Sequence, residues 1–253
     1  MPNTPLWLTA RPAAHRGLHD RSHGLVENTI PAFEAAIERG FAIELDVQPT
    51  ADGDAVVFHD HTLGRLTAEK GDVREHTRET LESIPVTGSG TTIPSLAKVL
   101  AHVDGRTPLI VELKSNFDGQ LALADAVAGA TNAYPGPLAL MSFDPALVTR
   151  LRTHKLGRPL GIVSASMGYE HWVHLSRWQS FVQGALLHRP ALWCDFISYN
   201  QDHLPALSPL LAKWLGRKAL LCWTVKNAAA AKRVSRYVDA ITFEGFDPYE
   251  LAP

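Results

Sequence analysis

PLIVELKSNFDGQLALADAVAGATNAYPGPLALMSFDPALVTRLRTHKLGRPLGIVSA, residues 108–165, alternates short apolar runs with longer amphipathic ones. Short runs rich in Leu, Ile and Val are typical of buried parallel strands. The runs of this kind are 108–114, 137–143 and 159–165. The segments between them, 120–130 and 145–155, have the apolar spacing of a helix that packs one face on a core. Alternating strands and helices predict a parallel sheet covered by helices.

The same alternation continues in both directions along the chain. Further strands are predicted at 13–15, 41–47, 195–200, 218–225 and 238–244. Further helices are predicted at 28–40, 77–83, 93–103, 204–216 and 227–237. Asn28 or Thr29 is a candidate cap for the first of these helices, and Gly40 ends it. The turn signal Asp52-Gly53 predicts that 55–60 folds back as a short hairpin arm after the second strand.

These segments form eight strand–helix units, with His15 to Gly40 as the first unit and the final helix missing. Eight such units in 253 residues predict a (β/α)8 TIM barrel with a short hairpin arm after strand 2. A doubly wound open sheet is the competing fold, but no Gly-rich loop follows the first strand to hold a dinucleotide. Because no break in composition or linker is visible, we expect one domain, 1–253.

The composition limits the class of protein. A hydrophobic content of 45% and a net charge of -2 are ordinary for a soluble globular chain and give no reason to expect nucleic-acid binding. Cys194 and Cys222 are the two cysteines, which excludes a disulfide framework and a multi-cysteine metal site. The start, MPNTPLWLTARP, does not have the pattern of a signal peptide, and no apolar stretch reaches the ~20 residues that span a bilayer. We therefore expect a cytoplasmic protein without stable membrane insertion. The sequence does not indicate an oligomeric state.

Glu44 and Asp46 occupy one face of the predicted strand 41–47, because side chains two residues apart on a strand point the same way. Two neighbouring carboxylates repel each other unless water, a proton or a cation separates them. In a barrel the alternate residues Ile43, Leu45 and Val47 would face the helices. The carboxylates would then face the interior, near the strand end at which such barrels have their active sites.

Further polar side chains are expected at the same end of the barrel. In VELK, Glu112 and Lys114 share a face, and His15 and Arg16 end the first strand. The hairpin arm would bring His59 to the same opening. Taken alone, an E-x-D pattern is more often a solvated strand face, and an E-x-K pattern is more often a surface ion pair. Their combination at the strand ends of one barrel favours a functional site.

The residue types indicate phosphate chemistry. Three carboxylates suit a hard cation, so Mg²⁺ or Ca²⁺ ranks ahead of Zn²⁺ and Mn²⁺, although His15 and His59 keep Zn²⁺ as an alternative. A bound cation would present a negative group such as phosphate, and Arg16 and Lys114 would contact its oxygens. The two histidines would supply the base and the acid that cleavage of a phosphodiester requires.

The ordered motifs resemble those of the glycerophosphodiester phosphodiesterase family. The quoted matches are HRG (15–17), ENTIPAFEAAIERG (27–40), IELDVQPTADGDAVVFHD (43–60), LGRLT (63–67), IPSLAKVL, VELK and CWTVKN. The resemblance implies a TIM barrel that uses a divalent cation to hydrolyse glycerophosphodiesters, which are small-molecule substrates, to sn-glycerol 3-phosphate and an alcohol. It also implies a role for each matching residue: metal ligands Glu44, Asp46 and Glu112; an acid–base pair His15 and His59; phosphate contacts Arg16 and Lys114; and a pocket wall Trp223.

Some segments depart from the family pattern. The loop LHDRSHGLV (18–26) carries His19 and His23, and His61 follows the hairpin arm. The last strand reads ITFEGFDP, so either Glu244 or Asp247 takes the place of the Asp that many members have there. Two alternative functions remain open: lysophospholipase D or sphingomyelinase D-like cleavage to a cyclic phosphate, and a non-catalytic phosphodiester-binding barrel.

Two features outside the motifs complete the predictions. The segment 165–193 is rich in aromatic residues, for which we expect helix packing, with a lid or a lipid-facing surface as the alternative. The aromatic residues concerned are Trp172, Trp178, Phe181 and Trp193. Cys194 and Cys222 lie at or beside apolar strands and are expected to be buried packing residues rather than reactive thiols.

Overall fold

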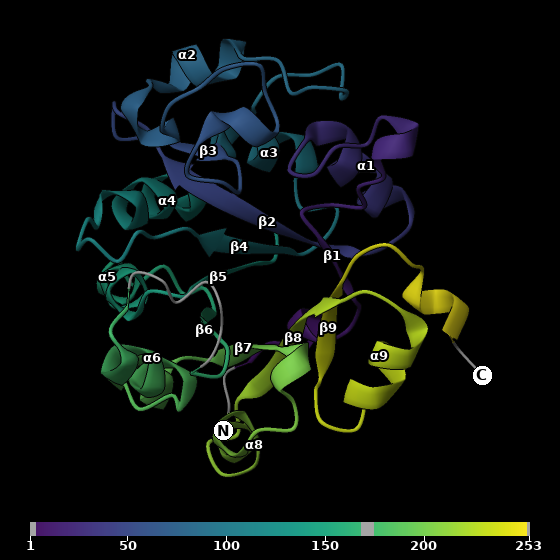
Figure 1. Ribbon diagram of the computed structural model, residues 1–253, viewed down its shortest axis with the longest axis vertical. Helices are drawn as coiled ribbons and strands as arrows, with labels where there is room; N and C mark the ends of the chain where they lie inside the picture. The colour runs from purple at the N-terminus through teal and green to yellow at the C-terminus, as the bar shows by residue number, and fades with distance from the viewer. Residues whose placement is uncertain (1–3, 168–174, 252–253) are drawn as a thin grey trace.

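Eight parallel strands close into a barrel with helices outside it, which confirms the TIM-barrel prediction (Figure 1). The computed structural model describes residues 4–167 and 175–251. The barrel strands are β1 Ala13–His15, β2 Ala42–Pro49, β4 Leu109–Leu113, β5 Leu138–Ser142, β6 Leu160–Ser164, β7 Phe196–Asn200, β8 Ala219–Val225 and β9 Ala240–Phe243. β1 pairs with both β2 and β9, and these two pairings close the sheet.

The hairpin arm is also confirmed. β3, Ala55–Val57, runs antiparallel to β2, and Val57 lies opposite Val47. Gly53 in the connecting turn has a φ of 79°, a left-handed conformation that glycine adopts without steric cost. The arm brings residues 58–62 back over the C-terminal end of β2, where Phe58 donates its backbone N–H to the carbonyl of Asp46.

The helices agree with the predicted pattern, with small shifts at their ends. They are α1 Ile30–Glu38, α2 Arg78–Ser83, α3 Leu96–Val103, α4 Ala122–Asn132, α5 Pro145–Thr153, α6 Arg177–Gly184, α7 Arg189–Trp193, α8 Leu207–Trp214 and α9 Ala228–Val234. α3 begins later than predicted because the Ser95 hydroxyl caps it by accepting from the N–H of Lys98. Among the described residues after β9, up to 251, the helical element is a short 3-10 helix, Pro248–Leu251, in agreement with the prediction of no final α-helix.

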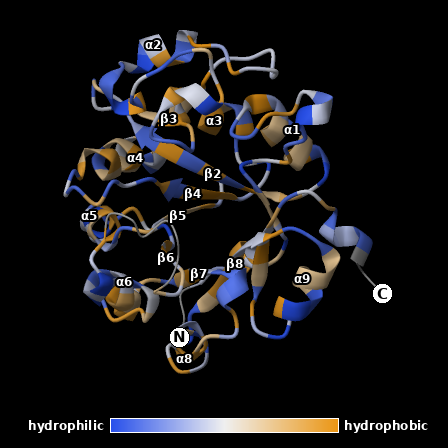
Figure 2. Ribbon diagram, in the orientation of Figure 1, coloured by the Kyte–Doolittle hydropathy of each residue, from blue (hydrophilic) through white to orange (hydrophobic). Residues whose placement is uncertain are grey.

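The two faces of β2 are buried in different surroundings, as the alternation predicted. Ile43, Leu45 and Val47 are fully buried in the layer between the barrel and the helices, in the same cluster as Phe33 of α1. Along β2 the colour in Figure 2 alternates between hydrophobic and hydrophilic residues. The hydrophilic face therefore points into the barrel.

The predicted packing of the 165–193 aromatic residues is wrong for Trp178. Its side chain is 69% exposed on α6, where it contacts Phe181 at a ring-centroid distance of 5.6 Å, and Phe181 is itself 40% exposed. Trp193 does pack against the core, with the Arg152 guanidinium 4.2 Å above its ring. Trp172 lies outside the described residues. α6 buries Ser180, Gln183 and Gly184 instead, and the local sequence does not show which face of the helix meets the barrel.

Both cysteines are buried, which confirms their predicted packing role. Burial raises the pKa of the Cys194 thiol to about 11 and that of the Cys222 thiol to about 12, so both remain protonated at neutral pH. None of the described helices has the length and apolar composition needed to cross a membrane.

Candidate active site

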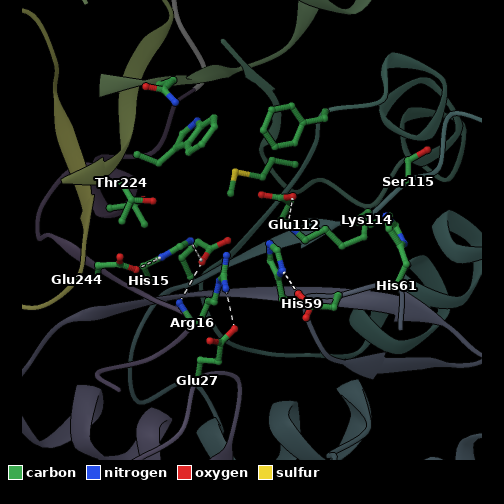
Figure 3. A pocket seen from close by; sticks show the side chains of 18 of the residues that line it. His15, Arg16, Glu27, His59, His61, Glu112, Lys114, Ser115, Thr224 and Glu244 are labelled. Atoms are coloured by element: carbon green, nitrogen blue, oxygen red, sulfur yellow. Dashed lines mark hydrogen bonds and ion pairs between the residues drawn. The ribbon is translucent and has the colours of Figure 1, made fainter. Parts of the chain in front are cut away.

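A cavity of about 850 Å³ opens at the C-terminal ends of the barrel strands (Figure 3). It is lined by nearly all of the predicted site residues, namely His15, Arg16, Glu44, His59, Glu112, Lys114 and Trp223. Asp46 does not line the cavity. It is 1% exposed and lies beneath the surface, in contact with Lys114. The barrel thus brings together predicted residues on or directly after four strands, β1, β2, β4 and β8, and one from the hairpin arm.

The three predicted metal ligands form one buried cluster. The register of the parallel strands places Asp46 of β2 directly beside Glu112 of β4. Glu44, Asp46 and Glu112 each offer a carboxylate oxygen, and these oxygens lie within 4.8 Å of one another. Burial, followed by the charges of Asp46 and Glu112, raises the pKa of Glu44 well above its usual range. An oxygen-only set of this size is suited to a hard divalent cation.

Two basic side chains contact these carboxylates. The Lys114 ammonium lies 2.8 Å from Asp46 Oδ1 and 2.6 Å from Glu112 Oε1, and Arg16 Nε lies 3.4 Å from Asp46 Oδ2. Burial by itself would raise the pKa of Asp46, but the positive charges of Lys114 and Arg16 hold it well below its usual range. Asp46 therefore stays ionised. Glu44 is the carboxylate whose ionised form an added cation would stabilise most.

Each candidate acid–base histidine contacts a carboxylate through Nδ1. His15 Nδ1 lies 2.7 Å from Glu244 Oε2, and His59 Nδ1 lies 2.6 Å from Asp60 Oδ1. Such contacts hold a proton on Nδ1 and leave Nε2 as the nitrogen that exchanges a proton with a ligand. Burial lowers the pKa of His15 and lowers that of His59 to about 4, so both rings are neutral at pH 7.

The structure decides between the two acids of the last strand. Glu244 reaches His15 inside the cavity, whereas Asp247 pairs with Arg39 outside it. The hydrogen bond with His15, together with the contact with Lys226, holds the pKa of Glu244 well below its usual range. Sequence reasoning could not make this choice, because it depends on the pairing of β9 with β1.

Asn28, one of the two residues predicted to cap the first helix, contacts the carboxylate cluster instead, and Thr29 takes the cap position. The Asn28 side-chain N–H donates to Asp46 Oδ2 at 2.9 Å, and its carbonyl oxygen accepts from the Asp46 backbone N–H at 3.2 Å. The φ of Asn28 is 57°, a left-handed conformation that Asn adopts more readily than most residues. Thr29 occupies the N-cap position, but its hydroxyl donates to the Val26 carbonyl instead of capping α1. In the sequence, the ENT motif was the available signal that Asn28 has a role beyond the helix cap.

Glu27 and Arg65 form a second layer around the site, and the sequence analysis did not give either residue a role. Glu27 accepts from Arg16 Nη1 at 2.7 Å and from two nitrogens of Arg65, each at 2.8 Å. Arg65 also donates to Asp60 Oδ1 at 3.0 Å. The network thus connects Arg16 with the Asp60 partner of His59. The only sequence signals for it were the motifs ENT and LGRLT.

We expect the Glu27→Gln substitution to lower the free energy of unfolding by about 1–2 kcal/mol at neutral pH, since it removes the negative charge that joins the partly buried Arg16 to Arg65. Burial opposes ionisation, but Arg65 and Arg16 lower the pKa of Glu27 to about 2. The stabilisation is therefore complete above the unfolded value of 4.5 and is lost as the pH falls toward 2. Urea unfolding at several pH values measures it. A loss equal to that of the exposed control Glu38→Gln would contradict the role of Glu27.

The remaining cavity residues include aromatic and histidine side chains. Trp223 donates its indole N–H to the Ser198 carbonyl at 3.1 Å, and its ring meets Phe143 edge-to-face at 5.4 Å. His19 and His61 line the cavity, whereas His23 does not and has a 76% exposed side chain. Trp223 therefore lies where a wall of the ligand pocket was predicted.

A sequence model described as "Glycerophosphoryl diester phosphodiesterase family" matches residues 15–245, which include every residue of the cluster described above. The chain belongs to this family. Among curated relatives, a glycerophosphodiester phosphodiesterase of Caldanaerobacter subterraneus is 39% identical over 112 residues, which cover 41% of this chain and 45% of the relative. One of Bacillus subtilis is 30% identical over 173 residues, which cover 66% of this chain and 55% of the relative. The chain thus spans about half the length of these curated relatives.

Solved structures share the fold over nearly the whole chain. An Oleispira antarctica phosphodiesterase, whose structure is described as a complex with the product sn-glycerol-3-phosphate, superposes with a TM-score of 0.73 at 20% identity, covering 92% of each chain. A glycerophosphodiester phosphodiesterase of Thermotoga maritima superposes with a TM-score of 0.67 at 24% identity, covering 91% of this chain and 92% of the other. At these identities the likeness establishes the barrel fold of this family member.

Proposed function

We propose that the chain hydrolyses glycerophosphodiesters to sn-glycerol 3-phosphate and an alcohol. The observation that carries the proposal is the buried cluster of Glu44, Asp46 and Glu112, which shares one cavity with two histidines that each contact a carboxylate. Membership of the family and the product named for the Oleispira antarctica structure support the choice of substrate.

Glu44, Asp46 and Glu112 would hold the divalent cation of this reaction. All three donors are carboxylate oxygens, and the raised pKa of Glu44 reflects surplus negative charge that a cation would neutralise. Such donors favour Mg²⁺ or Ca²⁺ over Zn²⁺, which prefers nitrogen and sulfur ligands, and we rank Mn²⁺ with Zn²⁺. When bound, the cation would polarise a phosphoryl oxygen of the substrate.

The side chains around the cluster have separate tasks in this proposal. Arg16 and Lys114, at the edge of the carboxylates, bind the remaining phosphoryl oxygens. One of His15 and His59 takes a proton from the attacking water at Nε2, and the other gives a proton to the departing alcohol oxygen. The water oxygen forms a bond to phosphorus as the bond to the alcohol oxygen breaks. Trp223 packs against the substrate as a wall of the pocket.

Removal of divalent cations is expected to abolish release of sn-glycerol 3-phosphate from glycerophosphocholine, and Mg²⁺ or Ca²⁺ is expected to restore it. A coupled assay for glycerol 3-phosphate measures the rate in EDTA and after addition of each cation. An undiminished rate in EDTA would contradict the role of the carboxylate cluster.

Phosphorus NMR of the product separates the proposed hydrolysis from the alternatives. A phosphate monoester is expected. A cyclic phosphate would indicate transfer to a neighbouring hydroxyl of the substrate instead of hydrolysis. Tight binding without turnover in Mg²⁺, Ca²⁺, Mn²⁺ and Zn²⁺ would indicate a phosphodiester-binding barrel.

A further inference from the structure

A second group of potential metal ligands lies beside the carboxylate cluster. His15, His19 and Glu244 each offer one ligand atom, and these atoms lie within 4.8 Å of one another. His15 ends β1, His19 follows in the next loop, and Glu244 follows β9, so the pairing of β1 with β9 brings the three residues together. His15 and Glu244 point toward each other at one end of the cavity in Figure 3.

The His19 ring carries an unsatisfied polar atom at this place. Its Nε2 is buried and has no hydrogen-bond partner among the described residues. The nearest carboxylate atom, Glu244 Oε2, lies 3.7 Å away, which is too far for a hydrogen bond. Buried polar atoms without a partner are rare, and such an atom is a candidate ligand for an ion.

The donor set differs in kind from that of the carboxylate cluster. Two imidazole nitrogens and one carboxylate oxygen match the ligands that hold zinc in sites with one open position. With zinc–ligand bonds of about 2.0–2.2 Å, tetrahedral ligand atoms lie about 3.3 Å apart. The contacts of Glu244 Oε2 with His15 Nδ1, at 2.7 Å, and with His19 Nε2, at 3.7 Å, fall on either side of that separation.

We propose that His15, His19 and Glu244 form a second metal site, which takes Zn²⁺ or a similar transition metal and is separate from the oxygen-only site. Zn²⁺ bound at His15 Nδ1 displaces the proton that Glu244 holds there, and this proton passes to the solvent. The bound Zn²⁺ also withdraws electron density from the ring, so Nε2 accepts a proton less readily. Binding at this site therefore inhibits the enzyme, a consequence that rests on the proposed function, whereas the binding itself does not.

Lys226, like Arg16 beside His15, carries a positive charge that opposes a cation here. Its ammonium lies 2.9 Å from Glu244 Oε1, the oxygen that the two histidines do not contact, and its side chain is 66% exposed. The exposed side chain is free to turn toward water when Oε2 binds a metal. The Lys226→Met variant removes this positive charge and is expected to tighten zinc binding by about 10-fold.

Zinc binding is tested with the full chain in excess Mg²⁺, which occupies the carboxylate site. Isothermal titration calorimetry with Zn²⁺ is expected to show one site in the wild type. The His19→Ala variant is expected to bind at least about 100-fold more weakly, since loss of even an outer partner of a metal ligand costs about 10–100-fold. His23→Ala is the matched control from the same loop and is expected to bind as the wild type does. Thermal unfolding confirms that each variant is folded.

Two outcomes would overturn the proposal. One is an absence of zinc binding to the folded wild type. The other is binding that survives in His19→Ala but is lost in Glu44→Gln, because the zinc would then occupy the carboxylate cluster. Retention of zinc binding by Glu44→Gln supports two separate sites.

The inhibition is measured separately, as the rate in Mg²⁺ with and without Zn²⁺ relative to each variant's own rate without Zn²⁺. The wild type and His23→Ala are expected to be inhibited at the zinc concentration that fills the site, and His19→Ala to resist that concentration. Equal inhibition of His19→Ala and the wild type would contradict the link between the site and His15. If the chain does not hydrolyse the diester even in Mg²⁺ alone, the proposed function fails, while calorimetry still decides the metal site.

Discussion

The Glu44→Gln variant is expected to lose at least about 1,000-fold in kcat/KM toward glycerophosphocholine, even in saturating Mg²⁺. The amide removes a charged ligand from the cluster of Glu44, Asp46 and Glu112. A metal that stabilises charge in the transition state contributes several kcal/mol, and each 1.36 kcal/mol corresponds to tenfold in rate. Steady-state rates measure the loss of activity, and calorimetry measures the loss of affinity for Mg²⁺.

Glu34→Gln is the matched control for this substitution. Glu34 lies on α1, where it pairs with His102 and Arg106 at the surface, far from the cavity lining. An exposed ion pair of this kind contributes about 0–1 kcal/mol to the free energy of unfolding. The kcat/KM of Glu34→Gln is therefore expected to stay at the wild-type value. Wild-type activity in Glu44→Gln would refute the assignment of Glu44 as a metal ligand.

The same Glu44→Gln variant is expected to be more stable than the wild type in EDTA, by about 1–3 kcal/mol in weakly alkaline buffer. Burial and the neighbouring charges raise the pKa of Glu44 above the unfolded value of 4.5. A carboxyl of this kind binds its proton more tightly in the folded state, so the stability it contributes below pH 4.5 is lost as the pH rises toward its folded pKa. The glutamine side chain does not titrate and has no such loss. The difference in the free energy of unfolding between the variant and the wild type therefore grows with pH.

Urea unfolding of both proteins across the pH range measures this difference. Saturating Mg²⁺ is expected to reverse it, because a ligand at 100 times its Kd stabilises the folded state that binds it by about 2.7 kcal/mol. If the variant were less stable than the wild type in EDTA at every pH, Glu44 would not carry the surplus charge that the structure indicates.

The His15→Asn and His59→Asn variants are each expected to lose about 100- to 10,000-fold in kcat, the usual contribution of a positioned acid or base. In the structure each ring has a carboxylate at Nδ1, from Glu244 and Asp60 respectively, so each is oriented to exchange a proton through Nε2. The exposed His23 gives the control His23→Asn, which is expected to keep wild-type activity.

A substrate with a p-nitrophenyl leaving group identifies which histidine is the acid. Such a leaving group departs without protonation, so the variant that lacks the acid recovers most of its rate, whereas the variant that lacks the base does not. One of the two variants is therefore expected to recover. If both variants were fully active with both substrates, the histidines would not be the acid and the base.

The sequence by itself determined the architecture and indicated the main candidate site residues. The alternation of apolar strands and amphipathic helices was sufficient for the barrel, because burial of one helix face or of a strand is a local property. The alternation along β2 likewise showed that Glu44 and Asp46 point away from Ile43 and Leu45. The spacing of VELK added Glu112 and Lys114, since residues two apart on any strand share a face.

Only the tertiary structure decided which side chains contact those residues and which side chains remain exposed. Glu244 rather than Asp247 reaches His15 across 229 residues of sequence, and this contact depends on the closure of β9 against β1. Asn28, which precedes α1, donates to Asp46, a contact that the capping preference of Asn did not indicate. Trp178 remains exposed where composition favoured packing. Periodicity reports the direction of a side chain within its own element, whereas its partner is set by elements that meet only when the barrel closes.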